Sequence, residues 1–372
     1  MRLRSALGGG ALAFTAGFNV SNVGAVADRV AASYGISLVV VGLFTTGLFV
    51  THAALQVPMG RLSDRLGARV VGAAGLAIVA GASAAALGWK EAWFAIGMRF
   101  VAGVGTAACF VSGAEYTRAT IGSAVAQGVY GATSMAAGGL ALALVPLWNS
   151  WRAPFGSAAI VAAAGLGLLA LAPRAPAAPR PARDQLTTVV DRRLLPLAAM
   201  HSASFGLSVV VGNWVVPLLH RAGGVSVEAA GIAGGLVLFL GVISRPLGGR
   251  LIDRTRVIRL SFVASSAGIA LLALAQPLAL MVLAASLVGL AAGIPFAPAF
   301  AGAQRLRPDA PAAAVGFVNM IAAVTILVGT PLVGLTFSLP SDGRVGFLAV
   351  AFLCLATTFV VPRRQSLSEN GG

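Results

Sequence analysis

The chain alternates long apolar runs with short polar segments, and the runs have the length of membrane-spanning helices. A helix needs about 20 predominantly apolar residues to cross the hydrocarbon core of a bilayer. Runs of this kind occupy residues 6–26, 36–57, 69–88, 92–112, 119–146, 152–171, 194–219, 226–247, 258–275, 277–301, 311–337 and 344–362. The pattern predicts an all-α membrane protein with twelve transmembrane helices.

The first apolar run has a second interpretation, as a secretory signal peptide. Arg2 and Arg4 precede it, and Ala25-Val26-Ala27 has the Ala-x-Ala pattern of a cleavage site. However, Asn19 and Asn22 interrupt the end of the stretch, and eleven further runs follow. We therefore expect an uncleaved first helix.

The composition excludes a soluble protein. Of the 372 residues, 58% are hydrophobic and only 10% are charged, whereas a soluble domain has about 25% charged residues. A net charge of +15 would suggest nucleic-acid binding in a soluble protein, but here the Arg residues are spread over many short loops. We therefore expect a lipid bilayer around the chain and no nucleic-acid partner.

The basic residues also orient the chain. If both termini are cytoplasmic, most of the 26 Lys and Arg residues fall in cytoplasmic loops, as the positive-inside rule requires. The predicted location is the cell membrane (inner or plasma), with many passes and both termini in the cytoplasm.

A Pro-rich linker at residues 173–193 divides the runs into six and six. Each half has a charged turn between its second and third runs, at residues 60–69 and 249–254. We expect two pseudo-symmetric six-helix bundles, at residues 1–172 and 194–372, as in many transporters built by duplication.

The charged turn has a family signature. The sequence Gly60-Arg-Leu-Ser-Asp-Arg-Leu-Gly-Ala-Arg69 resembles the Gly-x-Leu-x-Asp-Arg-x-Gly-Arg-Arg motif of the major facilitator superfamily, and the second turn is a weaker copy where that family has one. Arg99-x-x-x-Gly103-x-Gly105 resembles the family's second motif. The resemblance covers essentially the whole chain. It implies secondary transport by alternating access, with a substrate site near the midplane between the halves.

The sequence contains no catalytic, cofactor or metal motif that we recognise. Its only Lys is Lys90, outside any Gly-rich phosphate loop, which excludes a P-loop ATPase. Its three His and two Cys are scattered without the spacing of metal ligands or nucleophiles. We expect a monomeric transporter with no enzymatic activity, cofactor or metal, driven by a gradient, with protons as a candidate coupling ion.

Asp64 is the principal gating candidate. A carboxylate accepts hydrogen bonds from the free N–H groups of a helix start, and Pro311 in the segment 308–311 is placed as at a first helical turn. The family resemblance points to the same partner, in the eleventh run. We expect a latch on the cytoplasmic side. The candidate gating residues are Gly60, Asp64, Arg65, Gly67, Arg69, Gly249, Asp253 and Arg254.

Arg99 is the only basic residue well inside a run, and Arg245 lies near the inner end of the eighth. A charge at a helix centre costs at least about 2.5–3.5 kcal/mol on insertion scales, so Arg99 needs either carbonyl partners or an anionic solute. Arg245 either snorkels to the interface or binds an anion. No carboxylate lies in the middle of a run, which favours an anionic solute over a proton-relay pair.

The resemblance implies that runs 1, 4, 7 and 10 line the cavity. Together with the argument on Arg245, this gives the candidate substrate-binding residues. They are Asn19, Asn22, Arg99, His201, Asn213, Trp214 and Arg245.

Two local comparisons bear on the cargo. The segment 244–249 resembles the corresponding one in nitrate/nitrite porters of the same superfamily, but those have a partner Arg in the second run where this chain has Gln56. Residues 134–139 lack the Gly-Pro of the superfamily's antiporter motif. We therefore expect uptake of a small polar or anionic solute by symport or uniport. The alternative is a proton-coupled efflux antiporter for drugs or hydrophobic metabolites, favoured by the Arg99 motif.

Overall fold

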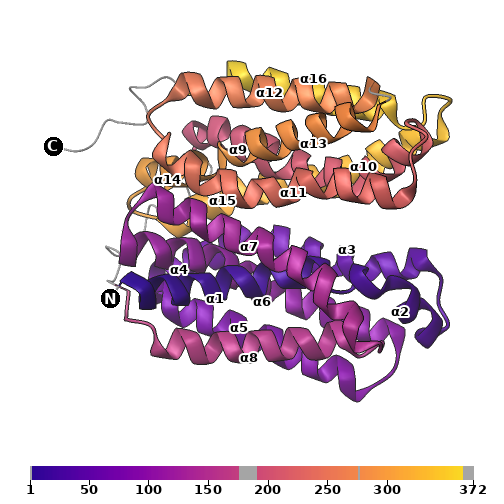
Figure 1. The fold of residues 1–372 in the computed structure, drawn as a ribbon. Helices are drawn as coiled ribbons and strands as arrows, with labels where there is room; N and C mark the ends of the chain where they lie inside the picture. Colours follow the sequence, from indigo (N-terminus) through magenta and orange to yellow (C-terminus); the bar gives the residue numbers. More distant parts are fainter. Residues whose placement is uncertain (1, 176–190, 275–276, 363–372) are drawn as a thin grey trace.

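The computed structural model describes residues 2–175, 191–274 and 277–362, and these residues form helices and no strands. The helices run roughly parallel and form two groups, one stacked on the other (Figure 1). The first group consists of α1 (Arg2–Ser21), α2 (Ala27–Tyr34), α3 (Leu38–Ala54), α4 (Gln56–Leu66), α5 (Ala68–Gly88), α6 (Ala92–Ile121), α7 (Ala124–Leu144) and α8 (Ala153–Leu171). The second consists of α9 (Leu195–His201), α10 (Leu207–Arg221), α11 (Val227–Arg250), α12 (Thr255–Leu274), α13 (Leu278–Gly293), α14 (Phe296–Leu306), α15 (Pro311–Leu335) and α16 (Arg344–Ala356).

These helices have the length and composition of membrane spans. Within the described residues, nine helical segments are long and apolar enough to cross a bilayer, and α3 with α4 forms a tenth span that bends by 52°. The 20-residue α1 and the shorter apolar α16 run beside them. The predicted all-α membrane fold is therefore confirmed.

Several predicted boundaries were wrong, most importantly at the first charged turn. Residues 60–66 are not a loop but the last part of helix α4, and the chain turns only at Gly67 (φ 93°). α4 can continue here because its residues alternate between buried and exposed faces, with Gly60 and Asp64 inward and Arg65 outward. α6 likewise extends nine residues beyond the predicted 112, to Ile121.

Two spans of the second group are irregular. The seventh is continuous from α9 to α10 through a π-helical segment, Ser202–Gly206. The tenth breaks between α13 and α14, at Ile294 and Pro295. The predicted linker 173–193 follows α8, and its last two residues already belong to the short 3₁₀ helix at Arg192–Leu194. Its residues 176–190 lie outside the described part of the chain.

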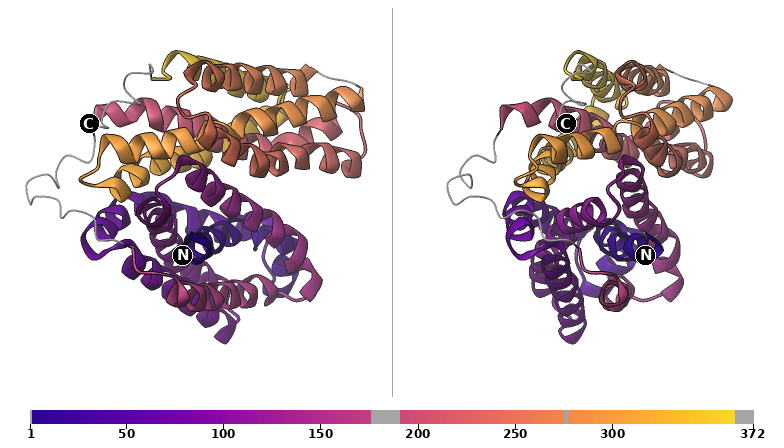
Figure 2. Two further views of the ribbon diagram at one scale, coloured as in Figure 1. Left: turned by 60° about the vertical axis from the view of Figure 1, so that its left-hand side comes forward. Right: turned by 90° about the vertical axis from the view of Figure 1, so that its left-hand side faces the viewer.

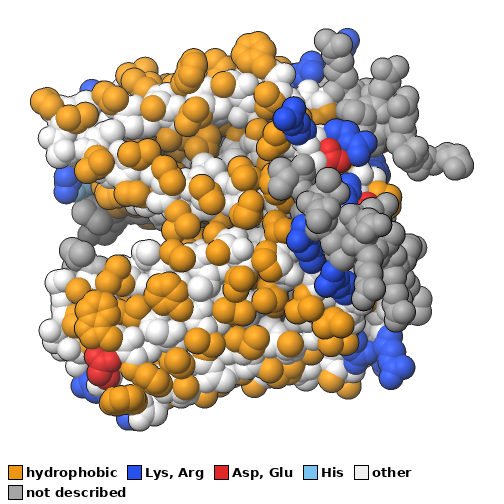
Figure 3. All heavy atoms as spheres, turned by 180° about the vertical axis from the view of Figure 1, so that it is seen from behind, with side chains coloured by type: hydrophobic (Ala, Val, Ile, Leu, Met, Phe, Trp, Pro, Cys, Tyr) orange, Lys and Arg blue, Asp and Glu red, His pale blue; other side chains and the backbone are white. Residues whose placement is uncertain are grey.

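Lys and Arg side chains gather at one end of the molecule, which we call the basic end (Figure 3). This is the end at which α4, α6, α11 and α14 finish, each with an Arg in or next to its last turn. Between the basic end and the opposite end, apolar side chains cover the surface (Figure 3). This distribution fits a protein surrounded by lipid, with the basic end at one membrane face.

The two groups meet near the basic end through a pair of equivalent contacts. Gly60 of α4 packs on the backbone of α15, so closely that a Cβ there would lie 2.6 Å from the Ala312 carbonyl oxygen. Gly249 of α11 packs in the same way on α7, where a Cβ would lie 2.5 Å from the Ala124 carbonyl oxygen. Only Gly permits so close an approach. The two charged turns therefore hold corresponding helix pairs together.

At the opposite end the groups diverge, and a cleft opens between them (Figure 3). The views in Figure 2 show the same two groups in contact on the side of α14 and α15. The molecule is thus closed at the basic end and open at the other.

Candidate functional site

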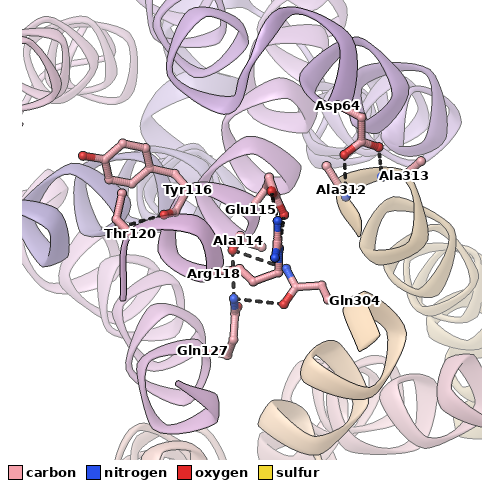
Figure 4. A network of polar contacts seen from close by, with 10 residues as sticks. All are labelled: Asp64, Ala114, Glu115, Tyr116, Arg118, Thr120, Gln127, Gln304, Ala312 and Ala313. Atoms are coloured by element: carbon pink, nitrogen blue, oxygen red, sulfur yellow. Dashed lines mark hydrogen bonds and ion pairs between the residues drawn. The ribbon is translucent and has the colours of Figure 1, made fainter. Parts of the chain in front are cut away.

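Asp64 bonds to the start of α15 in the other group. Its Oδ1 accepts a hydrogen bond from the Ala312 N–H and its Oδ2 from the Ala313 N–H, both at 2.9 Å (Figure 4). These are first-turn amides, which have no partner inside their own helix, and Pro311 precedes them at the first helical position. The carboxylate is only 4% exposed. The predicted contact between Asp64 and the start of the eleventh run is therefore present.

The second charged turn does not repeat this contact. Asp253 is exposed, and the start of α7 is capped instead by Ser123, whose hydroxyl accepts from the Ala126 N–H. The two helix pairs are alike in glycine packing but unlike in charge, so only the first pair has a buried carboxylate at its centre.

The remaining gating candidates have smaller roles in this conformation. Arg69 donates to the Ala170 carbonyl oxygen at 2.8 Å, which ties α5 to α8 within one group. Arg65 and Arg254 are exposed. Near Asp64, Glu115 and Arg118 form an ion pair at 2.6 Å on α6 (Figure 4).

Sequence reasoning missed a second polar contact between the groups. Gln127 Nε2 on α7 donates to the Gln304 Oε1 on α14 at 3.2 Å and to the Ala114 carbonyl oxygen at 2.8 Å. Gln304 Nε2 donates to the same carbonyl at 3.4 Å (Figure 4). Both glutamines are buried. A Gln in an apolar run does not by itself indicate a contact between the groups, because its partner lies 177 residues away.

An ion pair lies just before α15. Arg307 Nη2 is 2.7 Å from Asp309 Oδ2, and this hydrogen-bonded pairing holds the pKa of Asp309 below its ordinary value. The pair lies in the short connection between α14 and α15, beside the latch.

The predicted substrate residues do not form one site. Arg99 is buried inside the first group, where its guanidinium donates to the Asn19 carbonyl oxygen at 2.6 Å, to Asn19 Oδ1 and to the Phe44 carbonyl oxygen. It therefore joins α6 to α1 and α3. Asn22, directly after α1, donates to the Pro154 carbonyl oxygen at 2.8 Å and joins the end of α1 to the start of α8.

Asn213 and Trp214 lie together on α10, away from this cluster. Both bond to Thr330 of α15, Asn213 through its side-chain amide and Trp214 through its indole N–H. Trp214 also stacks on Phe337. These contacts hold the second group together toward the opposite end.

Arg245 and His201 are brought together at the contact between the groups. Arg245 is 2% exposed, and its Nη1 donates across the interface to the Gly131 carbonyl oxygen at 2.6 Å. Its guanidinium lies over the ring of Phe296, 4.3 Å from the centroid, and 5.5 Å from that of Phe205. Its Nε has no partner. The side chain therefore does not snorkel to the interface but lies in an aromatic enclosure.

His201 forms another wall of this enclosure. Its Nε2 is 3.1 Å from Asn319 Oδ1, and its ring contacts Phe205, Phe296 and Phe300. Its Nδ1 is buried without a partner. The enclosure thus combines one cation, one imidazole and one carboxamide with three phenyl rings, a set that suits a small anion with an apolar part.

Sequence reasoning missed the phenyl rings and Asn319 as parts of this cluster. Phe296 and Phe300 are four residues apart and face the same way on α14, but such a pair usually indicates core packing. Among the described residues, no group of three or more His, Cys, Asp or Glu side chains could hold a metal ion.

The sequence profile of the Major Facilitator Superfamily matches residues 10–330. The chain belongs to this family. It is a multi-pass membrane transporter, as the resemblance predicted. No curated protein matches the sequence.

Solved structures of similar fold come from the same family. The fucose:proton symporter of E. coli matches with a TM-score of 0.76 at 13% identity, over 97% of this chain and 98% of that one. The human organic anion transporter MFSD10 matches with a TM-score of 0.70 at 16% identity, over 97% and 99%. The proton:xylose symporter XylE matches with 0.71 at 15%, over 96% and 94%. None of the three is named as a nitrate or nitrite porter, so that local resemblance stays a prediction.

Proposed function

We propose that the protein is a secondary transporter that takes up a small organic anion by alternating access. The basic end faces the cytoplasm, because that places most Arg residues inside. The conformation described is then outward-facing, with the cleft open to the outside and the latch at Asp64 closing the cytoplasmic side. Transport by one chain suffices, since each chain contains both halves.

The observation that carries the proposal is the burial of Arg245. A buried guanidinium with one hydrogen bond and an unpartnered Nε leaves most of its donors unused, which is costly unless a ligand supplies acceptors. A carboxylate matches guanidinium geometry with two parallel hydrogen bonds. The phenyl rings of Phe205 and Phe296 next to it favour an apolar or aromatic body on that carboxylate.

Anion binding at Arg245 also acts on the contact between the halves. Its Nη1 donates to Gly131 of the first group, so an anion that takes both guanidinium edges displaces that carbonyl. The loss removes one inter-group hydrogen bond near the latch. Binding of the solute would thus favour the change from the outward-facing to the inward-facing conformation.

The proposal is tested by counterflow in liposomes with a panel of aliphatic and aromatic carboxylates, compared with neutral sugars. We expect counterflow of carboxylates and none of sugars. Arg245→Gln should raise the KM by about 10- to 100-fold, because a hydrogen bond to a charged group contributes about 1.5–3 kcal/mol. The matched control is Arg4→Gln, an exposed Arg on α1. Transport of sugars but not carboxylates, or proton-driven export of hydrophobic dyes, would overturn the proposal.

A further inference from the structure

His52 forms a polar chain inside the first group that the proposed anion site does not use. Its Nδ1 lies 3.0 Å from Thr106 Oγ1, and that hydroxyl donates to the Gly103 carbonyl oxygen. Thr106 therefore accepts from His52, which places the proton of the neutral ring on Nδ1. On the other side, His52 Nε2 lies 2.6 Å from Gln56 Nε2. The bare Nε2 accordingly accepts from the Gln56 amide.

The oxygen of the Gln56 side-chain amide is free to accept a hydrogen bond. Its Oε1 is buried and has no hydrogen-bond partner. A half-turn of this amide would place Oε1 where Nε2 now lies, 2.6 Å from the ring. A ring protonated at Nε2 would then donate to Oε1. The same heavy-atom arrangement therefore serves both the neutral and the protonated imidazole, and only the amide turns.

The pair lies between two contacts that join the halves. On one side, Phe49 contacts the His52 ring and belongs to an apolar cluster that includes Ile326 of α15. On the other, the Gln56 carbonyl packs against Gly316 of α15, where a Cβ would lie 2.4 Å from it. Separation of the halves at one of these two contacts would open the pair to that side alone.

The titratable side chains described around α3 do not bond to the His52 ring. The described titratable side chains on the elements that pack against α3 are Arg4, Arg29, Tyr34, Arg61, Asp64, Arg65, Arg99, Cys109, Glu115, Tyr116 and Arg118. Arg99 is bonded to Asn19 and Phe44, Cys109 faces the Gly72 carbonyl, and Asp64 is bonded to α15. The helix α15 has no titratable residue. Among these described side chains, none forms a hydrogen bond or ion pair with the imidazole.

We propose that the pair of His52 and Gln56 is the proton-binding site of this transporter. A proton from water adds to the Nε2 lone pair, the Gln56 amide turns to accept from it, and both steps reverse when the proton leaves on the other side. This inference rests on the proposed function, because the proton then accompanies the anion bound at Arg245. One proton with one monovalent carboxylate makes the transport step electroneutral.

The protonation step is tested directly by nitrogen NMR of the full chain in lipid vesicles, with ¹⁵N-labelled histidine. The chain has three His, so His52→Gln assigns one ring by its loss. We expect that ring to be protonated at Nδ1 only, and to gain a proton at Nε2 on acidification. Gln56→Leu removes the acceptor of the protonated form and should lower the titration midpoint. A ring protonated at Nε2 at every pH, or one that never titrates, would overturn the proposal.

Coupling is tested with the carboxylate that gives the strongest counterflow. A gradient of one pH unit drives about tenfold accumulation when one proton accompanies one anion. In His52→Gln, the ratio of pH-driven accumulation to counterflow should fall about tenfold. The matched control is His220→Gln, an exposed His near the opposite end. An unchanged ratio in His52→Gln refutes proton binding there, whereas absence of carboxylate counterflow in the unaltered protein refutes the anion proposal and leaves the NMR result to decide on His52.

Discussion

Gln56 and Arg245 occupy equivalent places in the two halves of the molecule. Each lies four residues before the glycine of its charged turn, and the carbonyl oxygen of each packs against a glycine of the other half, Gly316 and Gly128 respectively. The same position thus holds a neutral carboxamide in one half and a guanidinium in the other. This difference assigns the proposed proton site and the proposed anion site to opposite sides of one interface.

Neutralising the latch should weaken closure of the basic end. Asp64→Asn keeps one oxygen acceptor but loses the charge that favours a helix N-terminus, an interaction of up to about 2 kcal/mol in partly buried sites. We expect slower counterflow with normal membrane insertion. Spin labels across the basic end should report a larger population with that end open. Asp253→Asn is the control, because Asp253 is exposed. Equal effects of the two variants would mean that Asp64 does not act as a latch.

A methyl group at Gly128 should push α7 and α11 apart. A Cβ there would lie 2.3 Å from the Arg245 carbonyl oxygen, which is backbone and cannot turn away. Gly128→Ala should therefore expose the basic end to alkylating reagents. The control on the same helix is Gly139→Ala, whose Cβ meets nothing within 4 Å and should stabilise the helix by about 0.5–1 kcal/mol. The same accessibility in both variants would contradict the contact.

The two buried glutamines should be energetically coupled. Gln304→Leu leaves Gln127 without one acceptor, and an unsatisfied buried group costs about 1–3 kcal/mol. The double variant with Gln127→Leu removes both polar groups, so its loss of stability should be smaller than the sum of the single losses. Thermal unfolding of all four proteins measures the coupling. Strict additivity would mean that the contact contributes nothing.

Arg99 should act on stability and not on solute binding. Its hydrogen bonds to Asn19 and Phe44 contribute about 1.5–3 kcal/mol each, as for charged donors generally. Arg99→Leu should therefore lower the Tm and the yield of folded protein. The KM of the folded fraction should stay within about twofold of that of the unaltered protein, in contrast to Arg245→Gln. A large rise in KM without loss of Tm would mean that Arg99 binds the solute.

The pair of Arg307 and Asp309 predicts a small effect of pH. Because pairing lowers the pKa of Asp309 in the folded protein, its contribution is present above the pKa of the unfolded chain, about 3.9, and is lost as the pH falls through the lower folded value. Asp309→Asn should therefore lower the Tm at pH 7, and this effect should shrink as the medium is acidified through the pKa of the folded Asp309. A difference that persists at low pH would point to another cause.

The sequence allowed the all-α fold of membrane-spanning helices and the partner of Asp64 to be predicted, because each depends on a local signal. Apolar run length determines the spans, and Pro311 marks the helix start that Asp64 meets. The helical course of residues 60–66 was missed, because a charge-rich segment at a helix end resembles a loop until its buried face is known. Backbone carbonyl partners, such as those of Arg99, leave no signal in the sequence at all.

The enclosure around Arg245 could not be assembled from the sequence for a different reason. Gly131, Phe205 and Phe296 come from three separate elements in two halves, and each is an ordinary residue in its own helix. Only the packing of α7 on α11 and α14 brings them together. The same holds for Gln127 and Gln304.

Because Asp64 is buried, its contact with the start of α15 should depend little on the salt concentration. Mobile ions screen exposed charges over about 8 Å at physiological ionic strength, and surface ion pairs weaken accordingly. The Asp64 carboxylate is 4% exposed and meets backbone amides instead of a charged side chain, so there is little solvent between the partners for salt to enter. Closure of the basic end should therefore hold equally at low and at high ionic strength.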